Sequence, residues 1–75
     1  MAICYSCRSI RIGETGQGDT LMEALRAVED VFRMGLVAPA HEMLNGIIQQ
    51  GRANGVCHNC INDLQTLKSE IGRHI

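Results

Sequence analysis

The sequence has almost no aromatic side chains: Tyr5 and Phe32 are the only two, and tryptophan is absent. A protein that stacks bases or sugars on its surface needs such rings, so no stacking platform is expected. Long apolar runs are missing as well, and no stretch approaches the roughly 20 residues that cross a bilayer. We therefore expect neither a membrane span nor a membrane partner.

Neither sign of charge predominates, because seven Lys and Arg residues and eight Asp and Glu residues give a formal net charge of −1. Proteins that bind nucleic acids or acidic membranes usually carry a basic excess. The 75-residue chain is nevertheless 45% hydrophobic, which excludes a disordered tail. A core this small rarely supplies more than about 3–5 kcal/mol without a staple. We therefore expect one stapled domain over residues 1–75.

The staple is indicated by two C-x-x-C pairs, Cys4 with Cys7 and Cys57 with Cys60, which are separated by 49 residues. Two intervening residues let both sulfurs of a pair reach one metal ion at about 2.3 Å, and two pairs complete a tetrahedral site. We therefore predict that these four cysteines bind one structural Zn²⁺. His58 lies between two of them, where its side chain should point away from the metal.

Three other chemistries use cysteines with this spacing. Disulfides need an oxidising compartment, but residues 1–4 show no secretory signal, so we expect a reducing, cytoplasmic location. A thioredoxin-type redox motif lies within a βαβ pattern, and the sequence shows none. Iron, as a single ion or a cluster, is bound by the same four thiolates, so iron remains an alternative to zinc.

The N-terminal segment predicts a small knuckle hairpin, because short β-prone stretches at residues 2–4 and 9–12 flank the first cysteine pair. Residues 13–18 contain three glycines and predict an irregular loop. This loop imitates the phosphate-binding pattern G-x-x-x-x-G-K-[ST], but Asp19 stands where lysine is needed. A carboxylate there repels phosphate, so we expect a connector.

The first long helix is predicted from a T-x-x-E capping box at Thr20 and Glu23 to a stop at Gly35. Its apolar positions recur at helical spacing, with neighbours that broaden the stripe. A stripe this broad predicts cover on more than one side. The apolar positions that recur in this way are Leu21, Leu25, Val28 and Phe32.

Two further helices are predicted. The first of them runs from about Ala40 to Gln50, with Pro39 at its first position. The last begins inside the second cysteine pair, with Asn59 as its N-cap. Their apolar faces are expected at Met43, Leu44, Ile47 and Ile48, and at Ile61, Leu64, Leu67 or Lys68, Ile71 and Ile75.

In this arrangement an N-terminal knuckle supplies two ligands and the first turn of a C-terminal helix supplies two more. It resembles a treble-clef finger, although two helices replace the usual intervening hairpin. The resemblance rests on Cys4, Cys7, Cys57, Cys60 and the helix after them. It implies a fold but no function, because such fingers serve many tasks. The predicted fold is a zinc-stapled, mainly α domain with a knuckle hairpin and three helices.

No enzyme is expected, because four cysteines fill a tetrahedron, whereas a catalytic zinc keeps one position for water. His41 and His74 have no evident catalytic partner. We expect an adaptor, regulator or inhibitor that docks on a larger protein through its helical surface, with a homodimer left open.

The alternative is a zinc-dependent, nucleic-acid-binding transcriptional regulator that uses Arg8, Arg11 and Arg52 around the metal. The charge of the loaded protein argues against it, since four thiolates and one Zn²⁺ take the net charge from −1 to about −3.

Overall fold

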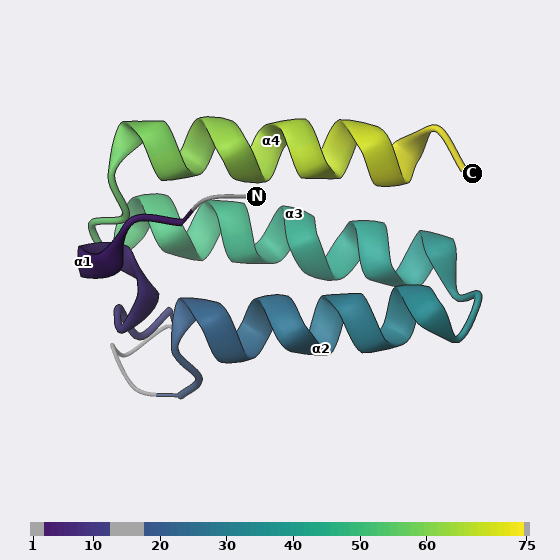
Figure 1. Ribbon diagram of the computed structural model, residues 1–75, viewed down its shortest axis with the longest axis horizontal. Helices are drawn as coiled ribbons and strands as arrows, with labels where there is room; N and C mark the ends of the chain where they lie inside the picture. The colour runs from purple at the N-terminus through teal and green to yellow at the C-terminus, as the bar shows by residue number, and fades with distance from the viewer. Residues whose placement is uncertain (1–2, 13–17, 75) are drawn as a thin grey trace.

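The computed structural model describes residues 3–12 and 18–74. These residues form four helices in chain order: α1 (Tyr5–Arg8), α2 (Leu21–Arg33), α3 (Val37–Ala53) and α4 (His58–Gly72). The three long helices lie side by side and alternate in direction, with α3 in the middle (Figure 1). The short helix α1 lies at the end of the row where α2 and α4 begin. The fold therefore brings the two cysteine pairs to one end of the molecule.

Helix α2 begins and ends as the sequence predicts. The Thr20 hydroxyl accepts a hydrogen bond from the Glu23 amide at 3.3 Å, and the Glu23 carboxylate accepts one from the Thr20 amide at 3.4 Å. These two bonds complete the capping box. After the helix, Gly35 has a φ of +84°, which L side chains rarely adopt. Both predicted helix signals are confirmed.

The bounds of the other two long helices differ from the prediction. Helix α3 is longer, running Val37–Ala53, and Pro39 is its third residue rather than its first. Pro39 is tolerated there because the first four amides of a helix have no intrahelical acceptor in any case. Helix α4 takes Cys57 as its N-cap, with extended backbone at φ −66° and ψ 157°, so the prediction of Asn59 is wrong.

The predicted knuckle hairpin is also wrong, because none of the described residues belongs to a strand. Residues 5–8 form a helical turn instead. Residues 10–12 pair with the segment that enters α2, through hydrogen bonds from the Ile12 amide to the Asp19 carbonyl at 3.1 Å and from the Leu21 amide to the Ile10 carbonyl at 2.8 Å. This pairing buries Ile12 against the helices rather than in a separate hairpin. Most of the predicted glycine loop, residues 13–17, lies outside the described residues.

The core is built on α3, whose backbone runs close to both α2 and α4, whereas the backbones of α2 and α4 stay further apart from each other. Leu21, Leu44 and Leu64, one from each long helix, are completely enclosed. The broad apolar stripe of α2 is therefore covered by α3 on one side. Its other side faces the space between α2 and α4.

Gly46, in the interior of α3, allows a test of whether this part of the chain is helical. A Cβ at Gly46 meets no atom within 4 Å, and alanine is favoured over glycine inside a helix by roughly 0.5–1 kcal/mol. We expect Gly46→Ala to raise the thermal midpoint by about 2–8 °C, as measured by circular dichroism. The matched control is Gly35→Ala, which also adds a methyl group in open space but at positive φ, and should lower the midpoint. Equal shifts for the two variants would contradict a structure in which residue 46 is helical and residue 35 lies between two helices.

Candidate metal centre

The four cysteine sulfurs lie within 4.8 Å of one another, although they come from opposite ends of the chain. The Sγ atoms of Cys4 and Cys57 are 3.8 Å apart. In a tetrahedral site with metal–sulfur bonds of about 2.3 Å, the sulfurs are also about 3.8 Å apart. All four cysteines are free thiols. The cluster therefore fits one metal ion, and the predicted convergence of the two pairs is confirmed.

Each pair reaches this cluster through the same local structure. The first cysteine is the N-cap of a helix and the second is the third helical residue, so that the two sulfurs lie on one side of the first turn. The N-cap backbones agree closely: Cys4 has φ −64° and ψ 154°, and Cys57 has φ −66° and ψ 157°. The C-x-x-C spacing thus matches one helical turn at both places.

Two reciprocal hydrogen bonds join the pairs. The Cys57 amide donates to Cys7 Sγ at 3.3 Å, and the Cys4 amide donates to Cys60 Sγ at 3.3 Å. Each N-cap amide therefore points at the second sulfur of the other pair, so the two motifs make equivalent hydrogen bonds to each other. Amide donors of this kind stabilise negative charge on sulfur and so favour the thiolate that a metal requires.

The four thiols differ in burial, since Cys7 and Cys60 are buried and Cys4 and Cys57 are exposed. Burial raises the pKa of Cys60 to about 12, against the amide of Cys4. The amide of Cys57 lowers the pKa of Cys7, but burial and the neighbouring thiols Cys4 and Cys57 together raise it above its usual value. Hydrogen bonds from the backbone and side chain of Cys60 lower the pKa of Cys57 to about 7. A metal ion therefore has to displace protons from the buried pair when it binds.

The histidines do not join the cluster. His58 is exposed in the first turn of α4 and is not one of the grouped ligands. His41 lies beside Gly72, and the rings of His74 and Phe32 form a T-shaped pair with centroids 5.5 Å apart. Within the described ranges, neither His41 nor His74 is grouped with other metal-ligating side chains either.

The basic residues near the metal end are partly engaged with the backbone. The Arg8 side chain donates to the Ile3 carbonyl at 3.3 Å, and the Arg11 side chain donates to the Gly18 carbonyl at 2.5 Å. Arg52 is exposed near the end of α3. Arg8 and Arg11 therefore help to hold the N-terminal segment in place.

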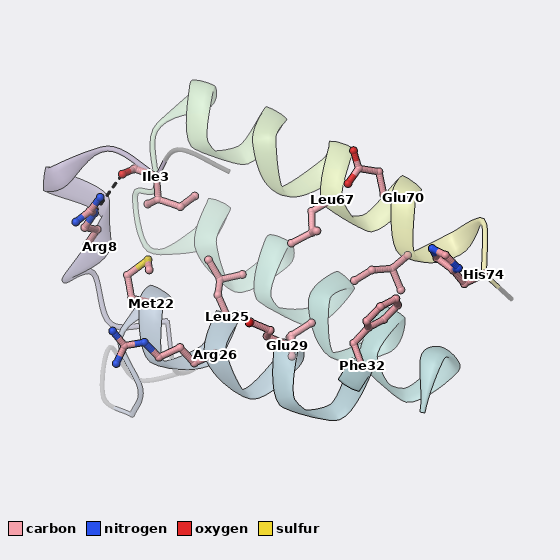
Figure 2. A pocket seen from close by; sticks show the side chains of 12 residues that line it. Ile3, Arg8, Met22, Leu25, Arg26, Glu29, Phe32, Leu67, Glu70 and His74 are labelled. Atoms are coloured by element: carbon pink, nitrogen blue, oxygen red, sulfur yellow. Dashed lines mark hydrogen bonds between the residues drawn. The ribbon is translucent and has the colours of Figure 1, made fainter. Parts of the chain in front are cut away.

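Sequence reasoning missed a groove of about 520 Å³ between α2 and α4, which we call the α2/α4 groove (Figure 2). The breadth of the apolar stripe on α2 was its only signal, because nothing in the sequence shows that α2 and α4 stay apart. Ile3 and Arg8 line the end nearest the cysteines. Its main apolar lining consists of Met22, Leu25, Val28 and Phe32 on α2, with Leu67 and Ile71 on α4.

Comparisons with protein-family models, with curated proteins and with solved structures found no match. Among the described helices, none combines the length and the apolar character that crossing a membrane requires. The structure thus defines a class, a small helical domain with a four-cysteine cluster that could hold a metal ion.

Proposed function

We propose that this protein is a zinc-stapled interaction domain that binds another protein and catalyses no reaction. Four thiols within 4.8 Å can fill all positions of a tetrahedral ion. Such a donor set leaves no open position for water or substrate, which is typical of a structural site rather than a catalytic one. Thiolates suit zinc, and zinc bound by four of them does no redox chemistry.

The α2/α4 groove is the main observation that supports binding to another protein. It is an apolar hollow between two helices that both pack on α3 and whose backbones stay apart. Residues that follow each other at helical spacing make its walls, so its shape suits a protein segment. In the proposed function zinc holds the N-terminal segment, with Ile3 and Arg8, at one end of the groove.

An adaptor, regulator or inhibitor could each use such a surface, by bridging two proteins or by covering part of one. Nucleic-acid binding is the rival function, and the engaged side chains of Arg8 and Arg11 do not favour it. A loaded protein with a net charge near −3 would also be repelled by phosphates.

Site-specific photo-cross-linking in cells of the source organism tests the proposal. A benzophenone amino acid replaces Glu70, which lines the groove, or Gln49, which is exposed on α3 outside it. We expect a discrete protein adduct from position 70 that Leu67→Asp removes, and none from position 49. Adducts that nuclease digestion removes, or equal adducts from both positions, would contradict the proposal.

A further inference from the structure

We propose that the α2/α4 groove receives an amphipathic helix of a protein partner, acidic at the end near the cysteine cluster and basic at the other end. This inference rests on the proposed function and adds the chemistry of the partner. Three features of the groove carry it: its shape, its half-exposed apolar walls and the placement of its charges.

The shape suits a helix. Helices α2 and α4 form the walls, and both pack on α3 behind them (Figure 2). A helix laid between them would complete a four-helix arrangement, and amphipathic helices commonly bind in apolar grooves of this kind. Helix α2 has 13 residues, which corresponds to about 20 Å at 1.5 Å per residue. The occupant therefore needs about three to four turns.

The walls expose apolar surface that a partner helix would cover. Leu25, Val28 and Ile71 are buried and form the floor, whereas Phe32 and Leu67 remain half-buried. Removing such apolar surface from water favours a complex. The occupant therefore needs an apolar stripe at helical spacing.

The charges on the groove are separated along its length. Arg8 and Arg26 lie toward the cysteine end, and Glu70 lies toward the other end (Figure 2). Glu29, between them, pairs with Arg33 in the single ion pair found among the described residues. Arg26 and Glu70 therefore have no ion-pair partner within residues 3–12 and 18–74. A helix with opposite charges at its two ends complements them.

A second copy of the chain is a poorer occupant, because a concave groove needs a convex apolar ridge. The exposed large apolar side chains are scattered and form no such ridge on one described helix: Tyr5 on α1, Met34 and Leu36 between α2 and α3, and Met43 on α3. The outer face of α3 also carries the polar residues Glu42 and Gln49.

The test uses a fluorescein-labelled synthetic helix of about 14 residues, or about four turns, with a leucine stripe, glutamates in one terminal turn and lysines in the other. Fluorescence anisotropy with the zinc-loaded protein should show saturable binding. Leu67→Asp places a carboxylate in the wall and should weaken binding at least tenfold. Met43→Asp, on an exposed position outside the groove, is the matched control and should change it less than twofold. Zinc content and circular dichroism check that each variant is folded.

A charge exchange tests the polarity with an exposed residue that is not needed for folding. Arg26→Glu should weaken binding of the bipolar peptide about two- to tenfold, as expected for exposed charge pairs. The same variant should bind a peptide with lysines at both ends more tightly than the wild type does. If the wild type and Arg26→Glu bind each of the two peptides with equal affinity, the proposed charge polarity of the partner helix is wrong.

Three results would overturn the helix occupant: no saturable binding, binding unaffected by Leu67→Asp, or a dimer in sedimentation that Leu67→Asp dissociates. The last would assign the groove to a second copy. None of them removes a groove-dependent protein adduct at position 70, so failure of this inference and failure of the proposed function remain distinguishable.

Discussion

Cys60→Ser is expected to abolish the cooperative thermal unfolding transition of the zinc-loaded protein. Cys60 is 1% exposed and its sulfur accepts a hydrogen bond from the Cys4 amide, so its loss removes both a ligand and a link between the two ends of the chain. Structural zinc contributes roughly 10–16 kcal/mol in zinc-finger peptides. A core of this size rarely supplies more than about 3–5 kcal/mol. The domain should therefore be largely unfolded without its metal, as circular dichroism and proteolysis would show.

A chelator should have the same effect on the wild type, and added Zn²⁺ should restore the transition. Ser6→Ala is the matched control, since Ser6 is exposed between the first two cysteines. It should leave metal content and melting unchanged. Purified protein without stoichiometric metal, or a native-like unfolding transition after chelation, would contradict the hypothesis that zinc stabilises the fold. Elemental analysis of the same sample also separates zinc from iron.

Leu44→Ala should have the second largest effect, a loss of about 2–5 kcal/mol in the free energy of unfolding. Leu44 is 0% exposed on α3, the helix that packs against both α2 and α4. Removing its side chain leaves a cavity that two neighbouring helices cannot close without moving. In a domain of this length the loss should lower the thermal midpoint by at least about 8 °C.

The adjacent Met43 provides the control, because it is 37% exposed and lies outside the enclosed core. Met43→Ala should cost less than about 1 kcal/mol, by chemical denaturation of the zinc-loaded protein. Similar losses for Met43→Ala and Leu44→Ala would mean that α3 is not the central helix.

Much of the fold could be predicted from short-range signals. The capping box at Thr20 and Glu23 and the stop at Gly35 are properties of a few neighbouring residues, and both are observed. The cysteine pairs are equally local, because two intervening residues match one helical turn. The prediction of a knuckle hairpin was wrong because β-propensity is a weak signal in so short a segment. Residues 10–12 instead form hydrogen bonds with the segment that precedes α2.

The N-cap of α4 was mispredicted for a related reason. Asn59 has the better capping side chain, but Cys57 takes the N-cap position. The Cys57 amide donates a hydrogen bond to the sulfur of Cys7, which is distant in the sequence. Side-chain capping contributes about 1 kcal/mol. Contacts across the cysteine cluster outweigh that preference, and they are invisible in the local sequence.

By itself, the sequence determined that two cysteine pairs could supply four ligands and that most of the chain would be helical, because spacing, caps and apolar periodicity act over a few residues. Only the tertiary structure decided that both pairs begin helices in the same way, and that α2 and α4 pack on α3 while leaving a groove between them. Packing of this kind depends on contacts between distant residues, and a pattern of neighbours carries no information about which faces remain uncovered.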